Sequence, residues 1–206
     1  MFSTYREWGA EYFMTDFLYA GALPGRRRLD VDALTAYATG MATIREAAGD
    51  AWIQGCGAPM LPSAGFVDTM RVGADIAPHY AAAFDDVSCP GMESAAISTI
   101  GRAFTHGRLW TSDPDCFSVR PEVEGREEWA AIVAAYGGSR ISSDRLNALD
   151  DWGLQRTRDL LKPSSEGVIG TDPPLCSDAT ARSLAAHSRP GRTAGDEFLQ
   201  YMRAAR

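Results

Sequence analysis

The chain has 206 residues, 45% hydrophobic and 23% charged, and its 20 basic and 27 acidic residues give a formal net charge of −7. This composition is typical of a folded globular protein of one domain, which excludes wholesale disorder. The acidity argues against a nucleic-acid-binding protein, because such proteins carry a net basic surface. No apolar run of about 18 residues predicts a transmembrane helix. Charged residues at positions 6, 7 and 11 interrupt the apolar core that a signal peptide needs, so we expect a cytoplasmic protein without membrane association.

The four cysteines (Cys56, Cys89, Cys116 and Cys176) form no Cys-x-x-Cys pair and do not cluster with the three histidines. This pattern argues against both a zinc site and a disulfide framework. We therefore expect reduced thiols that are buried or that line a pocket.

Short β-type runs alternate with amphipathic helical stretches, which predicts a parallel α/β sheet of about five strand–helix units. The predicted strands, in chain order, are residues 12–19, 51–55, 68–72, 108–111 and 140–142. The predicted helices are residues 30–48, 89–105, 126–136 and 144–161. After residue 162 the apolar periodicity ends in a stretch rich in Ser, Pro, Gly and Asp. We expect one α/β unit over residues 1–162, and an irregular or disordered tail over 163–206 with at most a short helix near 197–203.

Polar side chains follow the predicted strands at their carboxyl ends, where ligands bind in barrels and in doubly wound sheets. These residues are Asp16, then Cys56 and Gly57, then Arg71 and Asp75, then Asp113 and Asp115, and finally Ser142, Ser143 and Asp144. A set of carboxylates gathered in this way indicates acid–base or nucleophilic chemistry on a polar neutral ligand such as a sugar.

Some of these carboxylates also have structural explanations. Asp144 follows two serines at a predicted helix start, where an N-cap is the more frequent role. Asp113 and Asp115 flank a proline, and a turn explains them equally well. Asp16 lies within an apolar strand pattern, where an ionised side chain is costly unless it is paired or used. The residues around Asp75 leave its role open.

Four segments share their residues and their order with one enzyme family. TDFLYAGALPGRR looks like a nucleophile strand, and GCGAPMLPSAGFVDTMRVGADIAP looks like a Cys-Gly substrate segment that runs into an acid/base strand. LWTSDPDCFSVRP and GGSRISSDRLNAL look like the last two strands of the same barrel. Over roughly residues 1–162 the sequence thus resembles the α-galactosidases of glycoside hydrolase family thirty-six.

The resemblance implies a retaining glycoside hydrolase that cleaves terminal α-galactosyl residues by double displacement, with no metal and no other cofactor. Asp16 would be the nucleophile and Asp75 the general acid/base, facing each other across a groove. A retaining enzyme needs two carboxyl groups about 5 Å apart, one ionised and one protonated. The substrate would be an α-galactoside oligosaccharide or glycoside, and the resemblance places five further residues at the sugar. These are Cys56, Gly57, Arg71, Trp110 and Asp113.

The sequence departs from the family in two respects. Met14 stands where the family has a lysine that binds sugar hydroxyls, and methionine has no donor to replace it. The resemblance also begins at the nucleophile strand, so we expect a partial (β/α)₈ TIM-type barrel with helices on the outer face. An open sheet would expose inner-facing residues of the first strand, such as Phe13 or Phe17. We interpret the chain as a fragment with little activity alone, which a complementing N-terminal half or a homo-oligomer would complete.

Two other functions remain open. The chain could be a non-catalytic remnant that binds a sugar or a partner chain, which Met14 and the open sheet favour. It could also resemble an α-N-acetylgalactosaminidase, because the residues do not define the pocket for the 2-substituent of the sugar.

Overall fold

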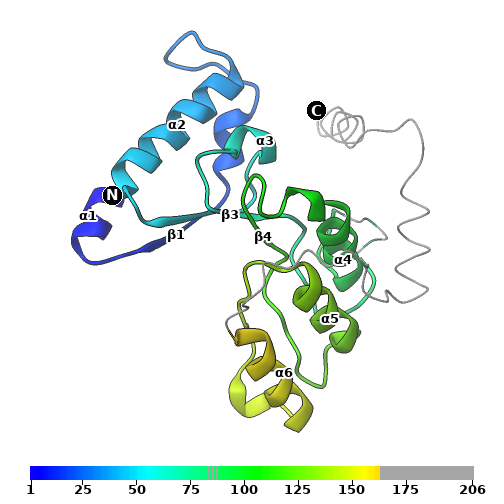
Figure 1. Cartoon of the computed structure of the whole chain (residues 1–206). Coiled ribbons are helices and arrows are strands. Elements are labelled where there is room, and N and C mark those ends of the chain that lie inside the picture. Colours follow the sequence, from blue (N-terminus) through cyan, green and yellow to red (C-terminus); the bar gives the residue numbers. More distant parts are fainter. Residues whose placement is uncertain (83, 85, 87, 163–206) are drawn as a thin grey trace.

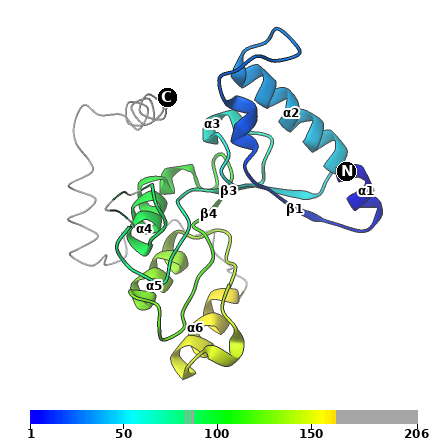
Figure 2. The ribbon, with the colours of Figure 1, turned by 180° about the vertical axis from the view of Figure 1, so that it is seen from behind.

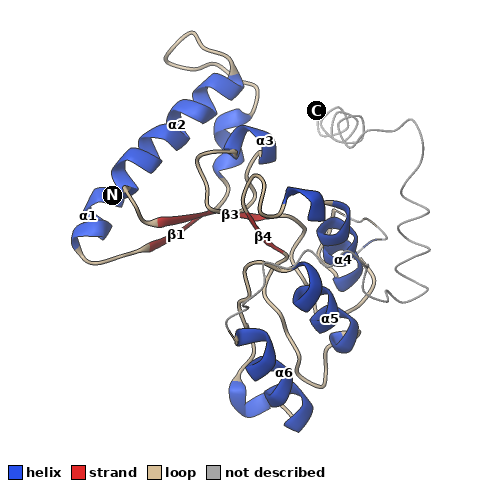
Figure 3. Cartoon of the chain, viewed as in Figure 1, coloured by secondary structure: helices blue, strands red, loops and turns tan. Residues whose placement is uncertain are grey.

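The computed structural model describes residues 1–82, 84, 86 and 88–162. A single sheet of four parallel strands lies at its centre, and the strands follow the order of the sequence. The strands are β1 (Tyr12–Thr15), β2 (Trp52–Gly55), β3 (Thr69–Arg71) and β4 (Thr111–Asp113). Figure 3 shows them as short segments between the helices. The prediction of a parallel α/β sheet is therefore confirmed.

Helices separate the strands along the chain. They are α1 (Phe2–Glu7), α2 (Ala33–Ala48), α3 (Met60–Ser63), α4 (Met92–Gly101), α5 (Arg126–Tyr136) and α6 (Asp151–Leu161). Short 3₁₀ helices within the described residues are η1 (Leu18–Ala22), η3 (Ala103–Thr105) and η4 (Leu146–Ala148). Figures 1 and 2 show α1 and α2 beside β1, and α4, α5 and α6 together at the other end of the sheet. No helix among the described residues is long and apolar enough to span a membrane.

Side-chain caps determine where two helices begin. The carboxylate of Asp32 accepts hydrogen bonds from the backbone N–H of Thr35 (2.9 Å) and from its hydroxyl (2.5 Å), so α2 begins at the next residue. Asp150 caps α6 by accepting the backbone N–H of Gly153 at 2.8 Å. The predicted N-cap at Asp144 is therefore wrong, because the last helix begins seven residues later than an Asp144 start would require, at Asp151.

The predicted fifth strand is reduced to one parallel bridge between Phe117 and Ser142. The backbone N–H of Phe117 donates to Ile141, and that of Ser143 donates to Phe117. Asp144 then holds this junction, because its buried carboxylate accepts from the backbone N–H of Val119. The side chain of Asp144 fastens two segments together, which explains its position after the two serines.

The outer face of the sheet carries the apolar residues. Phe13 of β1, Ile53 of β2 and Met70 of β3 belong to one buried cluster with Tyr37 and Met41 of α2. A second cluster joins α4, α5 and α6 and includes Phe117, Trp129, Ile132, Val133 and Leu160. Because neighbouring residues of a strand point to opposite faces, the residues between these apolar ones face inward.

The inner face of the sheet is open in the described part of the chain. Tyr12, Met14 and Trp52 point to this side and are 46%, 49% and 46% exposed. The expectation that Phe13 would be exposed there is wrong, because Phe13 is 8% exposed and packs on the outer face. Phe17 lies beyond β1 and is 67% exposed, as expected for an open sheet. The predicted tail over residues 163–206 lies outside the described residues.

The strand core should dominate the stability of this unit. Met70 is fully buried in the central strand β3, so Met70→Ala should lower the free energy of unfolding by about 2–5 kcal/mol through lost burial and a residual cavity. The matched control is Leu61→Ala, because Leu61 is 75% exposed and its truncation should change little. Urea unfolding followed by circular dichroism measures both. Equal losses in the two variants would contradict the placement of Met70.

Candidate active site

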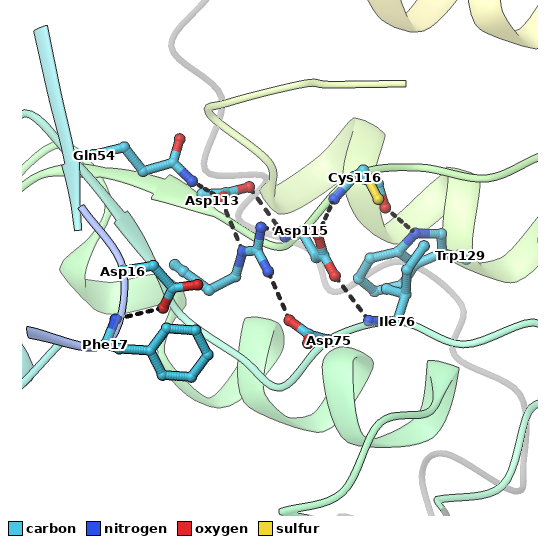
Figure 4. Close-up of polar contacts among 10 residues, drawn as sticks. Asp16, Phe17, Gln54, Asp75, Ile76, Asp113, Asp115, Cys116 and Trp129 are labelled. Carbon is cyan, nitrogen blue, oxygen red and sulfur yellow. Dashed lines mark hydrogen bonds and ion pairs between the residues drawn. The ribbon is translucent and has the colours of Figure 1, made fainter. Parts of the chain in front are cut away.

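The carboxyl ends of β1, β2 and β3 bring the predicted catalytic residues into one region, shown in Figure 4. Asp16 follows β1 directly, Cys56 follows β2 directly, and Asp75 lies four residues after Arg71 at the end of β3. The charges of Asp16, Asp75 and Arg71 all act on the thiol of Cys56. Residues that are far apart in the sequence therefore share one electrostatic environment.

The backbone around Asp16 is shaped to hold its carboxylate. The N–H of Phe17 donates to Asp16 Oδ1 at 2.6 Å, and Phe17 has a left-handed backbone with φ of 56°. Gly57 also has a positive φ, 52°, and a Cβ built there would lie 3.0 Å from Asp16 Oδ1. Gly57 thus leaves room for the carboxylate, and the strained conformation of Phe17 is of the kind that clusters at functional sites.

Arg71 lies at the centre of the region and contacts three carboxylates. Its Nε lies 2.9 Å from Asp113 Oδ2, one Nη lies 2.9 Å from Asp115 Oδ1, and the other lies 3.1 Å from Asp75 Oδ1. The side chains of Asp113 and Asp115 are 1% and 9% exposed, whereas that of Asp75 is 72% exposed. Arg71 is therefore anchored on its buried side and presents the remaining contact to solvent.

Burial and neighbouring charges shift the pKa values of this cluster in opposite directions. Burial alone would lower the pKa of Arg71, but the neighbouring charges of Asp113 and Asp115 raise it, so the guanidinium stays cationic. Burial raises the pKa of Asp113, and the positive charge of Arg71 opposes that rise. One guanidinium faces three carboxylates, so the cluster carries excess negative charge when all three are ionised.

The network extends to residues that the sequence analysis did not select. Gln54 of β2 is fully buried, and its amide donates to Asp113 while its carbonyl accepts from the hydroxyl of Tyr12. These contacts connect the inner faces of β1, β2 and β4. A glutamine inside an otherwise apolar strand, AWIQG, is the sequence signal that could have indicated it, since buried amides need partners.

Asp115 ties the end of β4 to the segment that carries Asp75. Its carboxylate accepts the backbone N–H of Ile76 at 2.8 Å and that of Cys116 at 2.6 Å. The backbone N–H of Asp115 in turn donates to Asp113 at 3.0 Å, which is the local turn that the Asp-Pro-Asp sequence predicts. Asp115 has a φ of 91°, so the backbone here is also held in an unfavourable conformation.

The thiol of Cys56 lies beside these charges but remains neutral. Burial raises the pKa of Cys56 to about 11, because the charged thiolate is poorly solvated there. A thiol with this pKa is not a nucleophile at neutral pH. Cys56 can therefore contribute shape and a weak hydrogen bond, which fits a substrate contact.

Two residues predicted to bind substrate are buried in the structure. Trp110 precedes β4, away from the carboxyl ends of the strands, and is 4% exposed in the core with its indole N–H donating to Thr105. Asp113 is fully buried and contacts Arg71 and Gln54. Trp110 therefore packs in the core, and the carboxylate of Asp113 is taken up by Arg71 and Gln54, so neither side chain is exposed for the predicted sugar contact. Among the described residues, no group of three or more His, Cys, Asp or Glu side chains could hold a metal ion.

The buried cluster should be sensitive to loss of its cation. Arg71→Met leaves Asp113 and Asp115 without their positive partner, which should lower the free energy of unfolding at neutral pH by about 3–5 kcal/mol. The matched control is Arg6→Met, whose partner Asp50 is 91% exposed, and its loss should be much smaller. Urea unfolding at pH 7 measures both variants.

The loss of unfolding free energy in Arg71→Met should also depend on pH. Burial raises the pKa of Asp113, so its charged form is the disfavoured one, and removing Arg71 strengthens that effect. The Arg71→Met variant should retain stability at a pH where Asp113 is protonated, and it should lose stability as the pH rises through the folded-state pKa of Asp113. The loss of stability in Arg71→Met should therefore shrink as the pH falls toward 3.8, the ordinary pKa of an aspartate. A deficit that is constant from pH 7 to pH 4 would contradict this account.

Comparison with known proteins places this arrangement in context. No protein-family model matches the sequence. Two structures of TtGalA, an α-galactosidase from Thermus thermophilus, match at 31% identity with TM-scores of 0.69 and 0.67. One contains stachyose and the other p-nitrophenyl α-D-galactopyranoside. The matches cover 79% of this chain but 36% and 34% of TtGalA, so the chain spans about a third of the length of that enzyme.

More distant glycosidases share the fold. α-Galactosidase I from Mortierella vinacea matches at 15% identity and a TM-score of 0.56, covering 77% of this chain and 44% of its own. A GH27 β-L-arabinopyranosidase from Geobacillus stearothermophilus matches at 12% identity and a TM-score of 0.53, covering 76% of this chain and 38% of its own. The four parallel strands with their helices thus correspond to part of the TIM-type barrel of glycosidases, and α-galactosidases are among the chain's structural neighbours.

Proposed function

We propose that this chain forms part of the catalytic barrel of a retaining α-galactosidase of glycoside hydrolase family thirty-six. One observation carries the proposal: Asp16 and Asp75 both act electrostatically on Cys56 at the strand ends of a chain that matches TtGalA at 31% sequence identity over 79% of its length. TtGalA was seen with stachyose and with an aryl α-galactoside. The proposed substrate of the complete site is therefore a terminal α-galactoside.

In the proposed mechanism, Asp16 attacks the anomeric carbon of the galactosyl unit. The bond to the leaving oxygen breaks as Asp75 gives that oxygen its proton, and a covalent galactosyl–Asp16 ester remains. Asp75, now a carboxylate, takes a proton from water, and this water displaces Asp16 and restores both groups. The bond from Phe17 N–H holds Asp16 Oδ1 and leaves Oδ2 for the attack.

Arg71 would orient both the sugar and the acid/base. Ion pairs with the buried Asp113 and Asp115 hold its guanidinium, so its position does not depend on substrate. The contact from Arg71 to the exposed Asp75 is the one that a sugar hydroxyl could replace. Substrate binding would then free Asp75 from its ion pair as the leaving group arrives beside it.

The open inner face limits what the described residues can do alone. Four strands do not close a barrel, which needs eight, so one side of the proposed pocket has no wall in the described residues. Further barrel strands would have to supply that wall. The exposed inner face and Met14 also favour the alternative function, a sugar- or partner-binding module without catalysis.

Hydrolysis of p-nitrophenyl α-galactoside tests the proposal. The full chain is assayed alone and after mixing with a polypeptide that carries the first three barrel strands of a related α-galactosidase. We expect little turnover by the chain alone and a large increase in the mixture, because positioning and water exclusion are each worth several kcal/mol of barrier. Asp16→Asn should lower the restored turnover by more than about a thousand-fold.

The control variant is Asp50→Asn, since Asp50 is an exposed aspartate outside the site. It should leave the restored turnover unchanged. Turnover that survives Asp16→Asn would exclude Asp16 as the nucleophile. Binding of galactose without any turnover in the mixture would favour the non-catalytic module.

A second variant compares the effect of Met14 with the effect of the open barrel on turnover. Met14→Lys restores one donor on the inner face, and one hydrogen bond to a sugar hydroxyl contributes about 0.5–1.5 kcal/mol, more when it is charged. In the isolated chain we expect this variant to gain far less turnover than wild type gains from the added strands. The same aryl galactoside assay measures both. A Met14→Lys chain that alone matches the mixture would reverse the ranking.

A further inference from the structure

A cavity lies in the loop between β1 and α2, outside the cluster around Arg71. Its volume is about 520 Å³, which is enough for a small sugar-sized molecule. The loop residues from Leu23 to Leu29 form most of its lining, which also includes Ala20, Gly21, Val31, Ala36 and Thr39. This loop follows the carboxyl end of β1, so the cavity belongs to the edge of the sheet where barrel ligands bind.

Three consecutive arginines line this cavity: Arg26, Arg27 and Arg28. Arg26 and Arg28 are exposed, and no ion pair or hydrogen bond connects either of them to another described residue. Five other arginines of the described chain are paired with aspartates: Arg6, Arg45, Arg71, Arg120 and Arg126. Two unpaired guanidinium groups therefore lie together at one cavity, in a chain whose net charge is −7.

Arg27 holds the loop in shape. Its guanidinium donates to the backbone carbonyls of Gly25 (3.1 Å), Gly21 (3.1 Å) and Leu23 (2.5 Å). The loop is thus folded around its own arginine, and the neighbours Arg26 and Arg28 are attached to a fixed backbone. Pre-organisation of this kind lowers the entropy lost when a ligand binds.

The nearby acidic residues do not neutralise the cavity. Asp30 and Asp32 follow the three arginines in the sequence, but neither lines the cavity. The carboxylate of Asp32 is occupied as the cap of α2, where it accepts both bonds from Thr35. The charge presented to a ligand in the cavity is consequently positive.

We propose that this cavity binds a phosphate group, carried by inorganic phosphate or by a small sugar phosphate, with Arg26 and Arg28 as its ligands. Guanidinium groups match the oxygens of a phosphate with paired, charge-assisted hydrogen bonds. The apolar side chains of Leu23, Pro24 and Val31 would lie against the carbon face of an attached sugar ring. The proposal is independent of Asp16 and Asp75, because neither residue lines the cavity.

Isothermal titration calorimetry on the full chain, in a phosphate-free buffer of low ionic strength, tests the site. The probes are inorganic phosphate, glucose 6-phosphate and neutral galactose. We expect both phosphates to bind wild type, and the double variant Arg26→Gln/Arg28→Gln to bind them at least about ten-fold more weakly. The control variant Arg108→Gln/Arg145→Gln removes two exposed arginines elsewhere and should change the affinity less than about two-fold.

The outcomes separate the two sources of phosphate and the two sites. Tighter binding of glucose 6-phosphate than of inorganic phosphate assigns the ester as ligand, and equal binding assigns the free anion. No binding of either probe to wild type, or equal weakening in both double variants, overturns the proposal. Any binding of galactose should be unaffected by Arg26→Gln/Arg28→Gln, so failure of the proposed galactosidase site would leave this result unchanged.

A chemical measurement provides a second test that needs no variant. Phenylglyoxal modifies exposed arginines, and mass spectrometry of the digested chain reports each position. Glucose 6-phosphate should protect Arg26 and Arg28 while Arg108 continues to react. Equal reaction at all three positions with and without the probe would also overturn the proposal.

Discussion

The guanidinium of Arg71 organises the ends of the strands. A buried pair of aspartates is stable only with a cation beside it, and Arg71 provides that cation for Asp113 and Asp115 at once. The same group reaches outward to the exposed Asp75. The position of Asp75, the proposed acid/base, thus depends on the buried ion pairs of Arg71 with Asp113 and Asp115.

Successive side chains of each strand point to opposite faces of the sheet, which separates the charged cluster around Arg71 from the hydrophobic core. Met70 points outward into the apolar cluster, and its neighbours Thr69 and Arg71 point inward. Gln54 is aligned with Thr69 in the parallel register, and Arg71 is aligned with Asp113. One face of the sheet can therefore carry a continuous polar network while the other supplies the apolar burial that holds the strands together.

Much of the architecture was predictable from the sequence because it depends on local chemistry. The helix over residues 126–136 was located to the residue by its apolar spacing and the glycines after it. The direction of Phe13 was not, because an edge strand in this sheet could turn either face toward α2 and a shift of one residue exchanges them. The predicted helix start at Asp144 was wrong because the partners of this carboxylate, Ser118 and Val119, lie about 25 residues away in the sequence.

The candidate site shows the same division. Asp16, Cys56, Arg71 and Asp75 were selected because they lie at or near the carboxyl ends of predicted strands, which a parallel sheet brings to one edge, and the family resemblance supplied their roles. The role of Asp113 as a buried anchor could not be predicted, because it depends on the alignment of β3 with β4 and on the amide of Gln54. Trp110 was misplaced because β4 begins at Thr111, three residues later than the predicted start at residue 108, which leaves Trp110 before the strand and in the core.

The edge position of β1 in the described sheet would couple folding to the binding of a polypeptide that pairs there. This strand is paired on one side only within the described sheet, so its other side presents backbone groups that still need hydrogen-bond partners. A polypeptide that pairs there binds the folded chain and not the unfolded one, and mass action then raises the apparent stability with the concentration of that polypeptide. In the presence of such a polypeptide, the melting temperature would depend on its concentration as well as on the residues of this chain.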